Sequence, residues 1–341
     1  MTRKLLILFT MVAVALLLFG CDAAEFTSAV DPENTEELLF TVPAGASTKG
    51  IAADLAEAGL VQNDWSFVQT VKSEGLDGKL KAGDYKLSKA MDQMEIAAIL
   101  ASGKAFVETF KIAIPEGYEF HMIAQKLADE GRINLETFEK LAEEHPFDYR
   151  FLQGERMYQK RLEGFLFPAT YEFKLGADEL DILTAMLDKF DRVFTDEMYA
   201  QAEAMGLTVN EVVTLASIVE RESRVAEEFP IIASVFHNRI KETQKLESCA
   251  TIQYLLGERK ERLLFVDLKI DSPYNTYMNA GLPPSPIASP GELALKSTLS
   301  PADTDYFYFV VSGDGDGKHQ FSTTYNEHLK AKAIADKKLG N

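Results

Sequence analysis

An internal repeat constrains the fold of this chain more than any other feature. The segments FTVPAGASTKGIAADLAEAG and IAIPEGYEFHMIAQKLADEG begin at Phe40 and at Ile112, 72 residues apart, and they align without gaps. Each one reads as a short strand, a Pro-x-Gly turn and an amphipathic helix that ends at a glycine. Apolar residues four positions apart, such as Ile51 and Leu55, give the helix one buried stripe. The repeat therefore predicts two strand–helix units, each followed by a second helix.

The first copy continues into a complete small module. A second helix is expected near 65–71, and LKAGDYKL at 80–87 reads as a strand that returns beside the first one. This order of strand, two helices and strand resembles the LysM-like module, which binds cell-wall glycan in its best-known members. A purely structural α+β module would show the same pattern, so both interpretations stay open for residues 38–110.

The N-terminus reads as an export signal. A basic start at 2–4 precedes an apolar run at 5–20, which is shorter than the roughly 20 residues that a membrane span needs. The run ends in LFGCD, where Cys21 resembles the lipidated cysteine of bacterial lipoproteins and Asp22 resembles their signal for retention at the inner membrane. An uncleaved single-pass anchor is the alternative for residues 1–21. Both interpretations place the body of the protein on the extracytoplasmic side of the inner membrane.

Residues 22–37 are polar and acidic, which predicts a tether between the membrane and the first domain. The formal net charge of −18 argues against nucleic acid as a partner, because phosphate binding needs a basic face. Cys21 and Cys249 are the only cysteines. If Cys21 carries lipid, no disulfide stabilises the fold and the hydrophobic core must do so.

The glycine-rich segment GDGDG at 313–317 is predicted to be a hairpin turn. It lacks the lysine and the following helix of a phosphate loop. Lys318 also stands where a calcium loop needs its third ligand. The histidines show no paired metal-ligand spacing. We therefore expect neither a metal nor a nucleotide cofactor.

Beyond the second copy the sequence is mainly helical. An aromatic-rich segment at 161–175 leads into helical stretches, and Thr208 with Glu211 forms a capping box. A loop rich in proline, glycine, asparagine and tyrosine covers 271–290, and the chain ends in a hairpin and a helix. The expected fold class is α+β, with a larger domain that is mainly helical and carries a small sheet.

The stretch TLASIVERES places two glutamates at the end of an apolar helix. The apolar stripe that starts at Leu215 repeats at i+3 and i+4 and continues at Glu222. On the same helical wheel, Glu220 lies on the flank of the stripe and Arg221 points away from it. A carboxyl group on a buried stripe tends to hold its proton, as a general acid must. Alternatively, Glu222 ends the helix and reaches water or a buried arginine.

Two further segments supply side chains that could bind a sugar. The loop SPYNTYMNAGLPPSPIASPG at 272–291 combines flat aromatic faces with amide groups, and LESCATIQY contributes Ser248, Thr251 and Gln253 near one end of a helix. Aromatic faces and amide hydrogen bonds together are typical of sugar-binding sites. A plain surface loop is the alternative interpretation.

Six segments together carry a specific resemblance. LEGFLFPATY, ASIVERES, ASVFHNRI, LESCATIQY, YNTYMNAGLPPSPIASPG and FVVSGDGDGKHQFSTTYNEH occur in the order of the endolytic murein transglycosylase (MltG, YceG-like) family, which this chain resembles over nearly its whole length. The resemblance implies a membrane anchor, a LysM-like region and a lysozyme-like catalytic domain at 111–341. Within that domain, 111–175 would carry the strand–helix repeat and a connecting segment, and 176–341 the lysozyme-like core.

The resemblance implies a lyase that cuts the β-1,4 bond between N-acetylmuramic acid and N-acetylglucosamine within peptidoglycan strands. One carboxylic acid protonates the leaving oxygen and then, as a base, activates the muramic C6 hydroxyl, which closes a 1,6-anhydro ring. The family pattern assigns this role to Glu222, and Glu220 is a candidate second carboxylate. The matching motifs imply substrate contacts by Ser223, Asn238, Ser248, Gln253, Tyr274, Asn275, Tyr277, Pro283, Pro284 and Phe321.

The implied partners are peptidoglycan glycan strands, the inner membrane and peptidoglycan synthases, because the family is thought to cut nascent strands and end their growth. Two positions depart from the family pattern. Ala169 stands where an acidic residue is usual, and Glu247 replaces a common glutamine. A hydrolase of the same fold and a non-catalytic glycan-binding lipoprotein are the alternatives to a transglycosylase.

Overall fold

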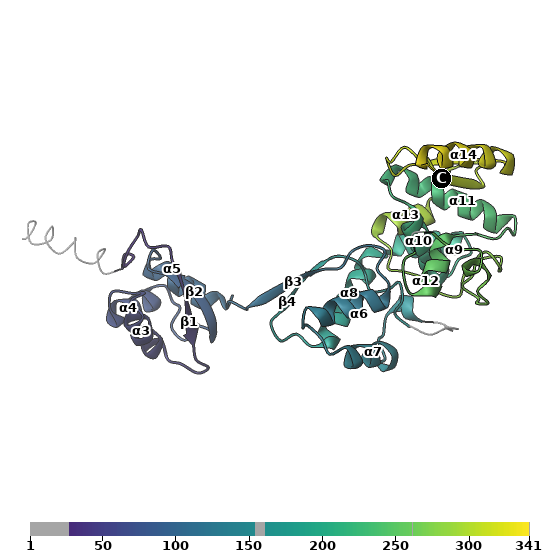
Figure 1. Ribbon diagram of the computed structural model, residues 1–341. Helices are drawn as coiled ribbons and strands as arrows, with labels where there is room; N and C mark the ends of the chain where they lie inside the picture. The colour runs from purple at the N-terminus through teal and green to yellow at the C-terminus, as the bar shows by residue number, and fades with distance from the viewer. Residues whose placement is uncertain (1–26, 154–160, 261, 341) are drawn as a thin grey trace, which may run out of the picture. The chain divides into compact units, whose positions relative to one another are not determined.

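The computed structural model describes residues 27–153, 161–260 and 262–340. The expected export signal or anchor at 1–21 and the start of the tether lie outside the described residues. The chain divides into two compact units between Glu108 and Thr109. Both units mix helices with short antiparallel strand pairs, so the expected α+β class is confirmed (Figure 1).

The first unit is built on one pair of antiparallel strands, with Phe40 opposite Tyr85 in the register. Two helices connect the strands, as the first copy of the repeat predicts, and a third helix follows them. Phe67, Tyr85 and Leu87 lie in its core, almost fully buried. The elements are β1 (Glu37–Val42), α3 (Thr48–Glu57), α4 (Asp64–Ser73), β2 (Gly83–Ser88) and α5 (Gln93–Ser102).

Residues just before β1, expected as part of the tether, run along this first unit. The backbone N–H of Asp31 donates to the carbonyl of Lys89 at 3.0 Å, and the N–H of Ala90 donates to the carbonyl of Asn34 at 3.0 Å. Backbone hydrogen bonds therefore fasten this stretch to the connection between β2 and α5.

The second unit begins with the second copy of the repeat. Its first strand pairs with β4, so that Ile112 lies opposite Tyr171, and a separate hairpin lies near the C-terminus. The elements of the repeat and its closing strand are β3 (Thr109–Ala113), α6 (Phe120–Asp129), α7 (Leu135–Glu144) and β4 (Thr170–Lys174). The remaining elements are α8 (Glu179–Val193), α9 (Asp196–Ala204), α10 (Val209–Glu222), α11 (Phe229–Lys241), α12 (Cys249–Leu256), α13 (Glu292–Leu299), β5 (Tyr308–Val311), β6 (His319–Ser322) and α14 (Tyr325–Leu339).

Matching glycines adopt matching backbone conformations in the two copies. Gly45 and Gly117, in the turn before the first helix, have φ values of +78° and +72°. Gly59 and Gly131, just after that helix, have φ values of +66° and +65°. Only glycine adopts this left-handed region without strain. The repeat seen in the sequence is therefore a repeat of backbone geometry.

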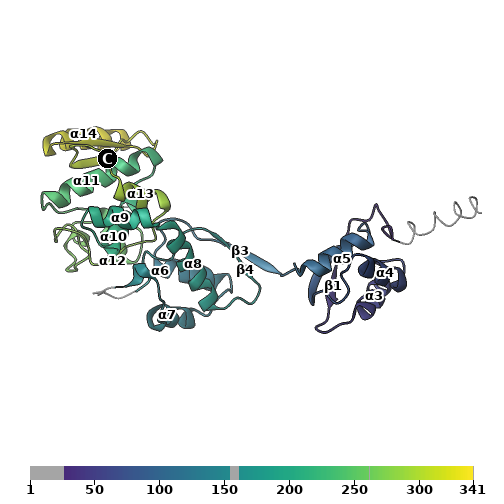
Figure 2. The ribbon, with the colours of Figure 1, turned by 180° about the vertical axis from the view of Figure 1, so that it is seen from behind.

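Helix α10 lies at the centre of the second unit. It packs against α9, α11, α12 and α13, and both ribbon views show it among these helices (Figures 1 and 2). Every residue from 212 to 219 is buried. A helix that is covered on all sides has no single buried stripe.

Among the described residues, no single helix combines the length and the apolar composition of a membrane span. One bent pair, Asp196–Ala204 with Val209–Glu222, meets these two criteria together across a bend of 94°.

Candidate active site

Helix α10 brings the two glutamates of TLASIVERES to one cavity. The helix begins at the predicted capping box, in which Thr208 Oγ1 accepts from the backbone N–H of Glu211 at 3.2 Å and Glu211 Oε2 accepts from the N–H of Thr208 at 2.8 Å. The helix ends at Glu222, the last residue with helical geometry. Its final turn therefore leaves the packed core and reaches a partly exposed surface.

Glu222 is held by the beginning of α12. Ser248 Oγ donates to Glu222 Oε1 at 2.5 Å, and the backbone N–H of Ala250 donates to the same oxygen at 3.3 Å. Ser248 is the N-cap of α12, and its own N–H donates to Thr276 Oγ1 at 3.0 Å. The carboxylate thus sits at a helix N-terminus, where backbone N–H groups bind anions.

A cavity of about 600 Å³ opens beside this carboxylate. Four residues that were predicted from the sequence to belong to the site line this cavity: Glu220, Glu222, Ser223 and Gln253. The full lining consists of Glu116, Gly117, Glu220, Arg221, Glu222, Ser223, Arg224, Cys249, Ala250, Gln253, Arg259 and Lys260. The lining therefore comes from the second copy of the repeat, from the end of α10 and the residues after it, from α12 and from the segment after α12.

Glu220 turns toward a different neighbour from Glu222. The backbone N–H of Gly291 donates to Glu220 Oε2 at 3.0 Å. Burial raises the pKa of Glu220 to about 7, while the hydrogen bond from Gly291 lowers it and the nearby carboxylate of Glu116 raises it. Near neutral pH this carboxyl group is therefore partly protonated.

Arg221, which was expected to point away from the apolar stripe, is itself buried against the second copy of the repeat. Its side chain is only 5% exposed, and Nη1 lies 3.1 Å from Glu119 Oε1 and 3.2 Å from the carbonyl oxygen of Gly117. The helical wheel did not predict this burial, because it assumes one buried face, whereas the repeat covers the last turn of α10 from another direction. Glu119 and Arg221 form a buried ion pair at the edge of the cavity.

Comparison with known proteins identifies the family. A model of the YceG-like family matches residues 40–334. This chain belongs to the YceG-like family. An endolytic murein transglycosylase of Bacillus subtilis (strain 168) is 35% identical over 314 residues, which cover 89% of this chain and 86% of that protein. The family predicted from the six sequence motifs is therefore confirmed.

Two more relatives extend the comparison. An endolytic murein transglycosylase of Streptococcus pneumoniae serotype 2 is 30% identical over 329 residues, and the match covers 88% of this chain and 58% of that protein. A crystal structure of a yceG-like protein from Listeria monocytogenes has a TM-score of 0.58 to this chain at 32% identity, and it covers 86% of this chain and 99% of that chain.

Several nominated residues of this YceG-like protein stabilise the loop between α12 and α13. Asn275 is fully buried, and its Nδ2 donates to the carbonyls of Leu268 and Ile270 at 3.1 and 2.7 Å. The ring of Tyr274 packs on Tyr254, with 5.3 Å between the ring centroids. These side chains fix the path of the loop and do not line the cavity.

Tyr277 contacts a residue that lines the cavity. Its hydroxyl is 3.1 Å from Sγ of Cys249, which lines the cavity. Burial raises the pKa of Tyr277, and the neighbouring Cys249 raises it further. The phenol therefore remains protonated and can act as a hydrogen-bond donor at the edge of the cavity.

The other nominated residues lie outside the cavity lining. Asn238 Nδ2 donates to the carbonyls of Thr304 and Tyr306 at 2.8 and 2.9 Å, and the ring of Phe321 stacks on Tyr306. Pro283 and Pro284 lie in the loop that Asn210 fastens to the start of α10 through the carbonyl of Pro284 at 3.2 Å. Of the two departures from the family pattern, Glu247 pairs with Arg239 at 3.1 Å, and the carbonyl of Ala169 accepts from Ile114.

Sequence reasoning missed the residues that connect the repeat to the site. Glu116 and Glu119 come from the second copy, and Thr276 Oγ1 accepts a hydrogen bond from the backbone N–H of Ser248. One signal was available, because the first copy has Ala44 and Ser47 at the aligned positions. Two small residues replaced by two glutamates indicate a new role for that turn.

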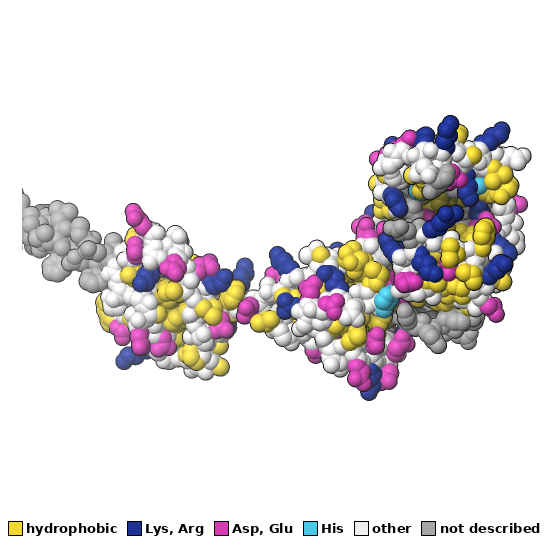
Figure 3. All heavy atoms as spheres, in the orientation of Figure 1, with side chains coloured by type: hydrophobic (Ala, Val, Ile, Leu, Met, Phe, Trp, Pro, Cys, Tyr) yellow, Lys and Arg dark blue, Asp and Glu magenta, His cyan; other side chains and the backbone are white. Residues whose placement is uncertain are grey.

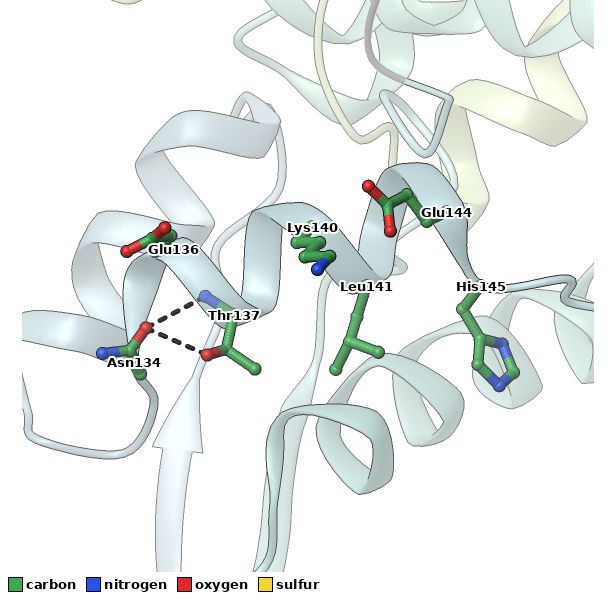
Figure 4. A pocket seen from close by; sticks show the side chains of 7 residues that line it. All are labelled: Asn134, Glu136, Thr137, Lys140, Leu141, Glu144 and His145. Atoms are coloured by element: carbon green, nitrogen blue, oxygen red, sulfur yellow. Dashed lines mark hydrogen bonds between the residues drawn. The ribbon is translucent and has the colours of Figure 1, made fainter.

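A second cavity, of about 670 Å³, lies along one face of α7 (Figure 4). Asn134 caps this helix there, and none of the nominated residues lines the cavity. Within 27–153, 161–260 and 262–340, no group of three or more His, Cys, Asp or Glu side chains is placed to hold a metal ion.

Proposed function

We propose that this protein is an endolytic murein transglycosylase that cuts peptidoglycan glycan strands. Its likeness to a Bacillus subtilis protein of that name covers 89% of the chain. The observation that carries the proposal is the placement of Glu222. This carboxylate lies in a cavity of about 600 Å³ and is fixed by Ser248 Oγ at 2.5 Å.

In the proposed mechanism, Glu222 is the catalytic acid and then the base. It protonates the glycosidic oxygen as the bond to the anomeric carbon of the muramic residue breaks. The resulting carboxylate takes the proton of the muramic C6 hydroxyl, whose oxygen closes the 1,6-anhydro ring. Ser248 and the N–H of Ala250 hold the carboxylate in one position for both steps.

The surroundings of Glu220 and of Glu163, the two candidates for a second catalytic carboxylate, support a lyase rather than a hydrolase. A hydrolase needs a second carboxylate across the scissile bond from the acid. Glu220 binds the backbone N–H of Gly291, and the buried Glu163 binds the backbone N–H of Phe120 at 2.8 Å. Both are thus engaged with backbone groups.

The first unit and the N-terminus complete the proposal. The order of strand, two helices and returning strand in the first unit supports a LysM-like glycan-binding module. The apolar run before Cys21 supports anchoring at the inner membrane, by lipid or by an uncleaved helix, with the catalytic unit on the extracytoplasmic side. In that position the enzyme would meet nascent strands beside the peptidoglycan synthases.

Mass spectrometry of glycan fragments tests the proposed reaction. Purified peptidoglycan should yield fragments with 1,6-anhydro-muramic ends, and Glu222→Gln should reduce their rate of formation by about 10²–10⁴-fold. Glu227→Gln removes an exposed carboxylate nearby and serves as the control.

Other products would contradict particular parts of the proposal. Reducing ends in place of anhydro ends would indicate a hydrolase, and Glu220→Gln and Glu163→Gln would then identify the second carboxylate. Binding to peptidoglycan without any turnover, equal in wild type and Glu222→Gln, would indicate a non-catalytic glycan-binding protein.

A further inference from the structure

The cavity beside Glu222 is lined by four basic residues and three glutamates, although the chain as a whole carries a net charge of −18. Lys and Arg side chains are spread over the second unit among acidic ones (Figure 3). Four basic residues nevertheless converge on this one cavity: Arg221, Arg224, Arg259 and Lys260. A cluster of basic side chains in an acidic protein favours the binding of an anionic partner.

Two of the four cations are neutralised within the protein. Arg221 pairs with Glu119 at 3.1 Å, and Lys260 Nζ lies 2.9 Å from Asp267 Oδ1. Arg224 and Arg259 differ from them, because neither forms a hydrogen bond or an ion pair with any residue that the structure describes. Their guanidinium groups remain available to a ligand.

The protein holds these two arginines beside the cavity by other means. The side-chain amide of Gln253 forms two hydrogen bonds with the backbone of Lys260. Gln253 Nε2 donates to the carbonyl of Lys260 at 2.8 Å, and the N–H of Lys260 donates to Gln253 Oε1 at 2.8 Å. These two hydrogen bonds fix the residue next to Arg259. A Cβ added at Gly317 would lie 3.4 Å from Cβ of Arg224, so the β5–β6 turn packs against that arginine.

Like charges crowd this corner of the cavity. Arg221 lowers the pKa of Arg259, burial adds to this, and Arg224 acts in the same direction. A guanidinium nevertheless stays protonated in proteins. Cations that repel one another in the free protein gain from an anion that binds between them.

The substrate in the proposed function supplies such an anion close to the bond that is cut. The muramic residue on one side of that bond carries a peptide through its lactyl group, and this peptide stem bears free carboxylates. Arginine binds carboxylates in a bidentate way that lysine cannot reproduce. We propose that Arg224 and Arg259 bind a carboxylate of the peptide stem on the muramic residue, so that the enzyme prefers peptide-bearing strands over bare glycan.

A diphosphate would satisfy the same two cations, but its position argues against it. The diphosphate of a nascent strand lies at the reducing end, whereas an endolytic cut falls within the strand. The stem is attached to the sugar that reacts. The inference rests on the proposed function, because only a glycan bound with its muramic residue beside Glu222 brings the stem to these arginines.

The test compares two substrates and three proteins. Wild type, the double variant Arg224→Ala/Arg259→Ala and the control Arg262→Ala act on peptide-bearing strands and on strands whose stems an amidase has removed. Arg262 is an exposed arginine three residues after Arg259 and does not line the cavity. Wild type and control should show kcat/KM higher by about tenfold on the peptide-bearing strands, and the double variant should show a ratio near one.

Binding separates a failure of this inference from a failure of the proposed function. Cosedimentation with both kinds of strand, using chains that carry Glu222→Gln so that the strands stay intact, measures affinity without turnover. A tenfold affinity ratio that the double variant abolishes supports the inference even if no strand is ever cut. Equal ratios in wild type and double variant would overturn it.

A third substrate distinguishes the two anions. Peptide-bearing strands with and without a reducing-end diphosphate should bind equally well to wild type. If the arginine dependence follows the diphosphate and not the stem, the assignment to the peptide carboxylate is refuted.

Discussion

The two copies of the repeat share a backbone but use it differently. In the first copy, the turn closes on itself through a hydrogen bond from the N–H of Ala46 to the carbonyl of Pro43, and a Cβ added at Gly45 would meet nothing within 4 Å. In the second copy, the N–H of Gly117 donates to the carbonyl of Ser289 at 2.8 Å. The same turn is thus open to solvent in one unit and built into the cavity in the other.

The first helix of each copy shows the same divergence. Ser47 caps α3 by accepting from the N–H of Gly50 at 3.1 Å. The aligned residue Glu119 makes no cap hydrogen bond for α6 and pairs with Arg221 instead. The distant Glu163 accepts from the first N–H of that helix in its place. In the second copy, long-range contacts therefore replace the local cap. One of them, the ion pair of Glu119 with Arg221, connects the repeat to the last turn of α10.

Removing Glu119 should have the largest effect on stability. Glu119→Ala leaves Arg221 buried without its charged partner, which we expect to lower the free energy of unfolding by about 3–5 kcal/mol. Urea denaturation followed by circular dichroism measures this loss. The double variant Glu119→Ala/Arg221→Met should recover much of it, because no buried charge remains.

A matched control lies in the first unit, where Glu37 and Lys86 form an exposed ion pair at 3.4 Å. Glu37→Ala should change stability by less than about 1 kcal/mol, since exposed pairs contribute little. If Glu37→Ala and Glu119→Ala prove equally mild, the second copy does not support α10 in the way that the structure indicates.

The carboxyl group of Glu220 should make the stability of the second unit depend on pH. Its pKa is about 7 in the folded protein, well above the ordinary value for glutamate. The folded state therefore holds a proton that the unfolded chain loses, and stability falls as pH rises from about 4.5 to 7. This carboxyl should contribute a fall of about 2–3 kcal/mol.

Glu220→Gln isolates this contribution. Urea denaturation at pH 5 and at pH 8 gives the fall in stability for each protein, and the variant should show the smaller fall. Glu227→Gln, an exposed glutamate shortly after α10, provides the control and should leave the pH dependence unchanged. A difference between Glu220→Gln and wild type that is the same at both pH values would refute the raised pKa.

The elements of the fold could be predicted from the sequence because their signals are local. Proline and glycine mark the turns of both copies, and Thr208 with Glu211 marks the start of α10 three residues apart. The burial of Arg221 could not be predicted, because its partner Glu119 lies 102 positions earlier in the chain. Hydrophobic periodicity indicates the face of a helix that packs against one surface, whereas α10 packs against several helices.

The candidate site was predictable in part. Family motifs led to Glu222, and the structure brings it together with Ser248, which was nominated from a different segment. The motifs could not tell residues that face the cavity from residues that shape its walls. Asn275 and Asn238 illustrate the difficulty, since both direct their amides to backbone carbonyls. A motif identifies a residue, but it does not show which neighbouring group the side chain of that residue contacts.

Alanine at the two matching turn glycines should give the smallest effects and the sharpest comparison. Gly45→Ala introduces strain at φ of +78° in open space, which should cost about 1 kcal/mol. Gly117→Ala meets the same strain and places its Cβ 3.3 Å from Cδ of Arg221, so the cost should rise to about 2 kcal/mol. The glycan-cleaving rate should fall only for Gly117→Ala, because Arg221 and Glu220 lie beside that Cβ.

Gly131→Ala provides the control within the second unit, since Gly131 has a φ of +65° and no atom near its added Cβ. It should match Gly45→Ala in stability and wild type in cleavage rate. Thermal unfolding and product analysis on the same samples measure both quantities. If Gly131→Ala slows cleavage as much as Gly117→Ala, the loss comes from strain in the repeat and not from the contact with Arg221. The second copy would then be a scaffold of the same kind as the first.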